Sequence, residues 1–172
     1  MNEVIKTMKE RRSVRSFKKE QIEDAQLDAI LEAGSWAASG MGKQASMIVA
    51  VQDPETIALM SKLNAAVMGM GIDPFYGAPT VVVVFADGEN MTPVEDGSLI
   101  MGNLLLAAAS VGVDSCWVHR AKEVFETEEG KALMEKWGVP ATYFGVGNCI
   151  LGYRDGALPA PPERKPGRIV KA

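Results

Sequence analysis

The chain has 172 residues, enough for one domain that buries roughly two thirds of its unfolded surface. Hydrophobic residues make up 47% of it and charged residues 23%, a balance typical of a folded globular protein that excludes intrinsic disorder. The formal net charge of −4 gives no reason to expect a polyanionic partner.

The first half of the chain predicts helices joined by polar segments, and one strand. Val4, Ile5 and Met8 share one helical face, and this pattern stops near Arg12. Asp-Pro at 53–54 predicts a helix start, because Asp caps the first turn and Pro is tolerated there. The elements expected here are a helix over 4–12, a polar connection over 13–19, a helix over 22–37, a loop of small residues over 37–42, a strand over 47–51 and a helix from 53.

The second half predicts a buried sheet and a long apolar helix. Thr80–Ala86 has four consecutive valines and is apolar on both faces, as in a strand inside a sheet. Val94–Val111 is the longest predicted helix; it is apolar nearly all round, so we expect a subunit interface to form part of its cover. Met60–Tyr76, rich in Met and Gly, is interpreted as a helix that frays into a flexible cover. Its methionines could serve adaptable packing or could face a substrate, and both interpretations remain open. The remaining expectations are a strand over 113–118, a helix over 122–137, a strand over 142–151 and an extended proline-rich arm over 156–166.

These elements predict a single domain over 1–155, with 156–172 as an extended C-terminal arm of the same domain. The longest apolar run, Leu104–Ala109, is too short to span a membrane, and the charged residues 1–12 do not resemble a secretion signal. Two isolated cysteines, Cys116 and Cys149, are too few for a disulfide scaffold. We therefore expect a cytoplasmic protein without membrane or nucleic-acid partners.

The charges are distributed unevenly along the chain. Residues 1–20 carry seven basic and three acidic side chains, a net of +4, and residues 155–172 carry a net of +2. The segment 21–154 between them carries a net of −10. Two interpretations remain open: the basic ends are solvated tails, or they converge on one anionic group such as a phosphate.

The sequence lacks the residues that several common catalytic and binding sites require. A lone histidine, His119, and the absence of a G-x-S-x-G motif argue against a Ser-His-Asp hydrolase and against a metal centre. The Gly-Lys pair at 42–43 lacks the first glycine and the Ser or Thr of a phosphate-binding P-loop. Gly145 and Gly147 continue into a strand rather than into a dinucleotide-binding turn.

The cluster Arg11-Arg12-Ser13-Val14-Arg15 is the strongest candidate for ligand binding. Its three guanidinium groups repel one another unless an anion or carboxylates lie among them. Arginine presents a planar fork of donors that suits phosphate and carbonyl oxygens, and Ser13 adds a hydroxyl group.

A series of further motifs follows this cluster. In chain order the series is Arg11–Arg15, Ala38–Gln44 before a strand, Ala78-Pro79 before the valines, Asp96 with Asn103–Ala108, Gly112–Val118, and Leu151-Gly152-Tyr153 with Pro161–Pro166. Over nearly its full length the chain thus resembles the nitroreductase family of FMN enzymes. It departs from the family's loop, which has Pro, Asn and Pro-Trp, at Ala38, Gly42 and Ala45-Ser46.

The resemblance implies an α+β fold of three layers, α/β/α, with a mixed, mainly antiparallel sheet and a long central helix at a homodimer interface. It implies non-covalent FMN, with NAD(P)H as co-substrate. Hydride would pass through the flavin to a small oxidised acceptor, a nitroaromatic or a quinone, in a ping-pong cycle. The chemistry would belong to the flavin, with no catalytic side chain and no metal.

The resemblance also implies which residues bind the cofactor. Arg15 would be a fixed cation beside the pyrimidine edge that stabilises the reduced flavin. The other expected contacts are Arg11, Arg12 and Ser13 to phosphate and ribitol, Ser39 supplied by the partner subunit, Gln44 near the cofactor, Trp117, Val118 and His119 along the ring, and Arg164 returning to the phosphate.

Two alternatives stay open. A flavin-binding or flavin-storage protein with little turnover would have the same fold and the same yellow colour. A nucleic-acid-binding protein would use the basic ends and bind with a steep salt dependence, but the acidic segment 21–154 argues against it.

Overall fold

The valine-rich segment forms strand β2 (Thr80–Asp87), which is buried up to Ala86, as expected for a strand apolar on both faces. The computed structural model describes residues 1–172 throughout. β2 pairs antiparallel with β1 (Ser46–Val51) and with β4 (Tyr143–Gly152), and β4 pairs antiparallel with β3 (Asp114–Val118). The sheet order is therefore β1-β2-β4-β3, with β1 and β3 at the edges.

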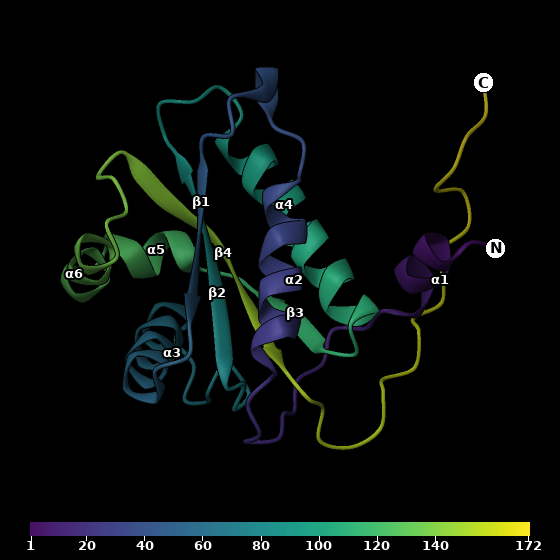
Figure 1. Ribbon diagram of the computed structural model, residues 1–172, viewed down its shortest axis with the longest axis horizontal. Coiled ribbons are helices and arrows are strands. Elements are labelled where there is room, and N and C mark those ends of the chain that lie inside the picture. Colours follow the sequence, from purple (N-terminus) through teal and green to yellow (C-terminus); the bar gives the residue numbers. More distant parts are fainter.

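Helices cover both faces of this sheet (Figure 1). One face carries α3 (Pro54–Met68), α5 (Ala121–Glu126) and α6 (Glu128–Lys136), and the other carries α2 (Asp24–Ser35) and α4 (Pro93–Ser110). The remaining helical elements are α1 (Glu3–Glu10), beyond α4, and the 3-10 turn η1 (Gly40–Gly42). The three-layer α/β/α fold is confirmed. Its strands are all antiparallel, and the parallel component is an isolated bridge between Ser13 and Ser115.

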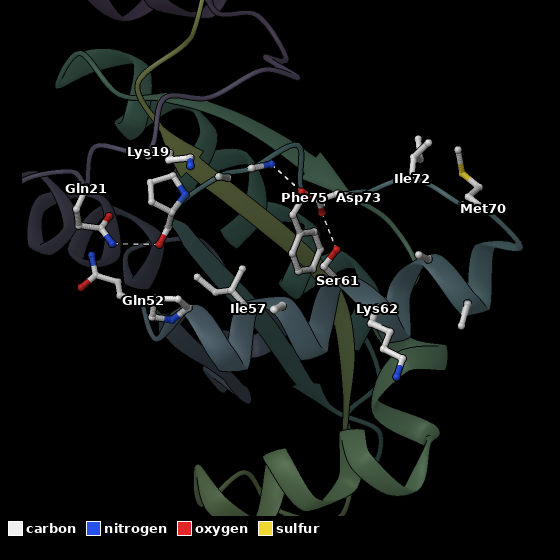
Figure 2. A pocket seen from close by; sticks show the side chains of 18 residues that line it. Lys19, Gln21, Gln52, Ile57, Ser61, Lys62, Met70, Ile72, Asp73 and Phe75 are labelled. Carbon is white, nitrogen blue, oxygen red and sulfur yellow. Dashed lines mark hydrogen bonds between the residues drawn. The ribbon is translucent and has the colours of Figure 1, made fainter.

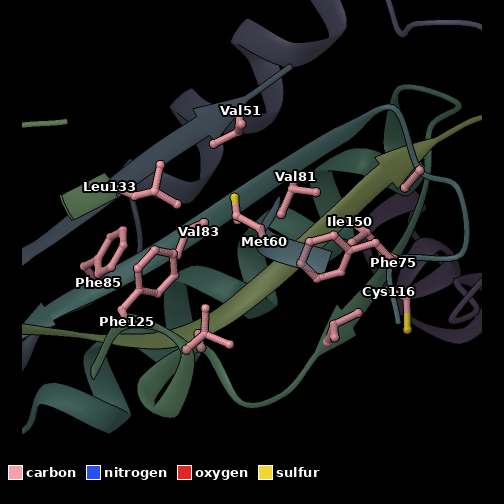
Figure 3. Packing of buried hydrophobic residues seen from close by; sticks show 14 of the residues in the cluster. Val51, Met60, Phe75, Val81, Val83, Phe85, Cys116, Phe125, Leu133 and Ile150 are labelled. Atoms are coloured by element: carbon pink, nitrogen blue, oxygen red, sulfur yellow. The ribbon is translucent and has the colours of Figure 1, made fainter. Parts of the chain in front are cut away.

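Alternation along β2 divides the core into two clusters. Val81, Val83 and Phe85 point into the cluster under α3, α5 and α6, where Phe85 and Phe125 meet edge to face at 4.8 Å between ring centroids (Figure 3). Val82 and Val84 point into the cluster under α2 and α4. Each fully buried valine contributes about 1.5–3 kcal/mol to folding, so this strand is a principal source of stability.

The predicted helix over 122–137 is wrong as a single element. The chain forms two helices, α5 and α6, which meet at Thr127. Thr127 has an extended backbone (ψ 162°), and its Oγ1 accepts a hydrogen bond from the N–H of Gly130 at 3.0 Å, which caps α6. A Cβ atom at Gly130 would overlap the backbone of Val124, so the corner is tight. Helical periodicity continues through such a corner, which is why the sequence pattern does not reveal it.

The interpretation of Met60–Tyr76 holds for its helical part and changes for the rest. α3 ends at Met68, and Gly69 follows in the left-handed conformation (φ 65°). The turns beyond it are fastened rather than loose, because the Asp73 carboxylate accepts hydrogen bonds from Ser61 Oγ at 2.6 Å and from the N–H groups of Phe75 at 2.9 Å and Gly77 at 2.7 Å.

Helix α4 packs closely on β4 and leaves its outer side open. A β-bulge leaves Val146 without a partner in β2, and a Cβ atom at Gly97 would lie 2.6 Å from the Val146 side chain. On the outer side Leu99 is 51% exposed, and Val94 is also exposed. None of the helices combines the length and apolar character needed to cross a membrane.

Candidate functional site

The arginine cluster lies where the chain leaves α1 and joins the edge of the sheet. Asn2 caps the start of α1, and Arg11 ends it with an extended backbone (φ −55°, ψ 137°). Ser13 then forms the parallel bridge to Ser115 of β3, and the N–H of Val14 donates to the Ser115 carbonyl at 3.0 Å. This pairing places the side chains at the C-terminal end of α1 beside the first residues of β3.

A polar cavity of about 180 Å³ opens at this junction. Arg11, Arg12 and Ser115 line it, and each has a buried polar atom with no hydrogen-bond partner: Arg11 Nη1, Arg12 Nε and Ser115 Oγ. These are three of only five such side-chain atoms in the chain. Buried donors are nearly always satisfied in proteins, so three unsatisfied ones around one cavity indicate a ligand rich in acceptor oxygens.

Two acidic residues, Glu10 and Asp114, line this cavity, and Asp114 is already paired with an arginine outside the cluster. Asp114 accepts hydrogen bonds from the Arg154 backbone N–H and from Arg154 Nη1, each at 3.1 Å. Arg11 and Arg12 take part in no ion pair; Arg12 Nη1 instead donates to the carbonyls of Lys9 at 2.7 Å and Arg11 at 2.8 Å. Neither guanidinium group is therefore held in an ion pair within the chain, and both are available to an anion.

Arg15 lies on the extended segment that follows. The N–H of Lys18 donates to the Tyr153 carbonyl at 2.9 Å, and the N–H of Asp155 donates to the Ser16 carbonyl at 2.9 Å. The segment thus runs beside the end of β4, and Arg15 stands on it exposed and without an ion pair.

Trp117 and Val118 end β3 and His119 follows it directly, but their side chains differ in accessibility. Val118 is buried in the core, Trp117 is half-buried against Gly147, and only His119 is exposed. β3 is an edge strand, and beyond Ser115 its outer main-chain groups pair with no strand. A planar ligand at this edge would therefore meet the backbone and His119 rather than the side chain of Val118.

Ser39 and Gln44 lie far along the fold from the arginine cluster, around η1 (Figure 1). Ser39 Oγ accepts a hydrogen bond from the Gln44 N–H at 3.0 Å. The two residues line a cavity of about 370 Å³ with Ser46, whose buried hydroxyl group has no partner. A single chain does not bring these residues to Arg11 and Arg12.

Arg164 belongs to the C-terminal arm, which is exposed from Gly156 onward. The arm begins beside α1, because Leu158 lines the same cavity as Arg11, and both chain ends lie on one side of the molecule (Figure 1). The two basic ends therefore share a side. Arg164 itself forms no hydrogen bond or ion pair with the cluster.

Two functional candidates escaped sequence reasoning. Ser115, 1% exposed, lies inside the Gly112–Val118 motif, and a polar residue in a buried strand was the available signal. Asp96 was noticed only as part of the long helix, although it is a buried carboxylate that accepts a hydrogen bond from the Gly40 N–H at 2.9 Å. Nothing local in the sequence shows which backbone group meets either side chain.

The largest cavity, about 1030 Å³, lies between α3 and the turns over 70–79 (Figure 2). Its walls are largely apolar, and several of its polar groups are bonded to one another: Gln21 Nε2 donates to the Pro79 carbonyl at 3.0 Å, and Ser61 donates to Asp73. No unpartnered buried atom points to a ligand there.

The two cysteines lie in the core and form no reactive site. Cys116 and Cys149 are free and buried, and burial raises the pKa of the Cys149 thiol. No group of three metal-ligating side chains converges anywhere in the chain. The arginine junction is therefore the best-supported ligand site.

Comparison with known proteins gives a consistent result. The model of the nitroreductase family matches residues 8–74 and 70–153. A proposed NADH dehydrogenase/NAD(P)H nitroreductase of Archaeoglobus fulgidus is 33% identical over 159 residues, covering 89% of this chain and 86% of the relative. The FMN reductase [NAD(P)H] of Bacillus subtilis is 41% identical over 176 residues, covering 89% of this chain and 66% of the relative.

Two solved structures resemble the whole fold. A nitroreductase with bound FMN from Bacteroides fragilis has a TM-score of 0.92 at 31% identity, with 100% of both chains covered. Another nitroreductase with bound FMN, from Desulfitobacterium hafniense, has a TM-score of 0.90 at 28% identity, covering 100% of this chain and 99% of the other.

Proposed function

The chain belongs to the nitroreductase family, and from this premise we propose that it is an FMN-dependent oxidoreductase using NAD(P)H. Its acceptor would be a small oxidised molecule such as a nitroaromatic or a quinone. FMN, when bound, would supply the redox chemistry, namely hydride transfer from the nicotinamide and reduction of the acceptor. The side chains of the protein would bind the cofactor, orient the substrates against it and shield it from solvent.

The observation that carries this proposal is the set of unpartnered donors at the end of α1. Arg11, Arg12 and Ser115 offer buried donors without partners, and neither arginine forms an ion pair. The phosphate group of FMN has the charge and the acceptor oxygens that this junction lacks. The residues present therefore fit the cofactor, with Arg11, Arg12 and Ser13 as its phosphate and ribitol contacts.

The remaining contacts extend from this anchor. Arg15, exposed on the neighbouring extended segment, would place a positive charge beside the pyrimidine edge and favour negative charge there. Trp117, Val118 and His119 would border the ring, chiefly through the free edge of β3 and the His119 side chain. Arg164 would return to the phosphate, with 156–172 acting as an arm of the same domain.

A second copy of the chain would complete the site. Ser39 and Gln44 lie away from Arg11 and Arg12 within one chain, which supports their supply by the other subunit of a homodimer. α1 carries no buried residue, and the outer side of α4 exposes apolar side chains, so both helices offer an apolar surface to a partner.

No side chain in this scheme acts as acid, base or nucleophile. His119 is exposed, and both cysteines are buried in the core and do not line the cavity at the arginine junction. The site would thus hold nicotinamide and acceptor in turn, which gives ping-pong kinetics.

The visible spectrum of the purified protein tests the proposal. We expect a yellow protein, or a colourless one that turns yellow with FMN, whose flavin absorbance is bleached by NADH or NADPH without oxygen. Addition of a quinone or nitroaromatic should restore the absorbance within the turnover time. A protein that does not bind added FMN contradicts the proposal. A protein that binds FMN, but whose flavin is reduced only very slowly by NADH or NADPH, supports flavin storage instead.

A further inference from the structure

The segment Ser39–Gln44 combines a strained backbone with exposed side chains. Met41 and Gln44 have φ angles of 56° and 51°, in the left-handed region that favours glycine. Each such residue costs on the order of 1 kcal/mol, so surrounding contacts must hold it. The side chains of Met41, Lys43 and Gln44 point to solvent, so this strain serves no packing within the chain.

A buried carboxylate holds this segment in place. Asp96, 3% exposed on the first turn of α4, accepts hydrogen bonds at Oδ1 from the Gly40 N–H at 2.9 Å and from Thr92 Oγ1 at 3.1 Å. Its Oδ2 accepts a third from Asn90 Nδ2 at 2.9 Å. One side chain therefore joins η1, the start of α4 and the turn after β2.

The elements around this carboxylate are closely packed. A Cβ atom at Gly40 would overlap Thr92 Oγ1, so η1 rests directly on the start of α4. α4 in turn is fixed on the sheet by the close approach of Gly97 to Val146. The position of η1 is thus set relative to the sheet through Asp96.

We propose that Asp96 is a positioning residue for FMN: it presents Ser39 and Gln44, already ordered, to the cofactor held by the second copy of the chain. This inference rests on the proposed function. An ordered contact surface loses less conformational entropy when the cofactor binds, so fixing η1 in advance strengthens binding without adding a contact.

The hydrogen-bond pattern makes Asp96→Asn a sharp test. A carboxylate accepts at both oxygens, as Asp96 does, whereas an amide accepts at one side and donates at the other. In Asp96→Asn one donor must face another, at the Gly40 N–H or at Asn90 Nδ2. The double variant Asp96→Asn/Asn90→Asp restores an acceptor opposite each donor and keeps the net charge.

We expect Asp96→Asn to raise the Kd for FMN about tenfold, the effect of losing one such contact, and the double variant to return it to within about threefold of the wild type. Fluorescence titration of the apoprotein with FMN measures both values. Asn90→Ala is the matched control, because it removes one bond to Asp96 and leaves the contact with Gly40; it should change the Kd less than Asp96→Asn. Equal Kd values for the wild type and Asp96→Asn, or no recovery in the double variant, would overturn the inference.

Trypsin cleavage at Lys43, exposed within the segment, reports its order in the absence of flavin. We expect faster cleavage there in Asp96→Asn than in the wild type or in the double variant. If Asp96→Asn does not fold, Gly40→Ala displaces η1 while the carboxylate stays, and it should show the same two effects. Unchanged cleavage and affinity in Gly40→Ala would count against the inference. A wild-type protein that binds no FMN instead overturns the proposed function, and with it this role.

Discussion

At the scale of single residues, the support for a cofactor site comes from side chains that have no hydrogen-bond or ion-pair partner. Arg11 and Arg12 have no carboxylate partner, and with Ser115 they direct unpartnered buried atoms to one junction. Arg12 also donates to two carbonyls at the end of α1, so it stabilises the helix terminus while its Nε remains free. These unpartnered atoms are the reason for proposing a cofactor site at the cluster.

The double variant Arg11→Ala/Arg12→Ala should lose FMN without unfolding. Charge-assisted hydrogen bonds contribute about 1.5–3 kcal/mol each, so losing two raises the Kd at least ~100-fold. Lys6→Ala/Lys9→Ala removes two positive charges from the same helix on exposed side chains and should leave the Kd within about threefold. Titration with FMN and a thermal melt separate binding from stability. Full cofactor occupancy in the arginine variant would show that the site is assigned wrongly.

At the scale of elements, glycines decide how closely helices and strands approach. Gly97 lets α4 meet the bulged residue Val146, and Gly130 lets α6 begin directly against the end of α5. Both close contacts lie between elements that sequence periodicity treats separately. The same periodicity runs through Thr127, which is why one helix was expected where two form.

Gly130→Ala should destabilise the α5–α6 corner strongly. The added methyl group overlaps the Val124 carbonyl and approaches Phe125 Cα within 2.7 Å, and such overpacking costs about 1–3 kcal/mol. Gly71→Ala is the matched control, because the new methyl group lies in open space, the φ angle is not positive, and alanine lowers the entropy of the unfolded chain. Thermal unfolding should give a lower melting temperature for the first variant and an equal or higher one for the second. Equal melting temperatures for Gly130→Ala and the wild type would mean that the corner is looser than described.

For the whole molecule, the main consequence of the proposed function is that one chain would contribute to two cofactor sites. The arginine cluster lies beyond α4 with both chain ends, and η1 lies elsewhere along the same layer (Figure 1). The apolar outer sides of α1 and α4 offer the surface through which two copies could bring the arginine cluster and η1 together.

Leu99→Glu should turn a dimer into a monomer and weaken FMN binding at the same time. Leu99 is 51% exposed on the outer side of α4, where a charge would be buried on association at a cost of several kcal/mol. Ile72→Glu, at 50% exposure on the other face of the sheet, is the control and should alter neither property. Light scattering gives the mass, and flavin absorbance gives the occupancy. A wild-type monomer that holds FMN tightly would contradict the two-copy site.

Features that depend on near neighbours along the chain can be predicted from the amino-acid sequence alone. Four valines in a row made β2 a buried strand, Asp53 and Pro54 started α3, and the crowded cluster Arg11–Arg15 indicated an anion. The order of motifs indicated the family, and the family model bears it out. Each of these features is visible in a few consecutive residues or in the order of motifs along the chain.

Which distant residues meet depends on how the whole chain packs. The tertiary structure brought Ser115 to the arginines through one parallel bridge, seated Gly40 on Asp96, and kept Ser39 and Gln44 apart from the cluster within one chain. Its corner at Thr127 and its fastened turns at Asp73 replaced a continuous helix and a loose cover. These outcomes depend on packing between segments far apart in the chain, which no local pattern encodes.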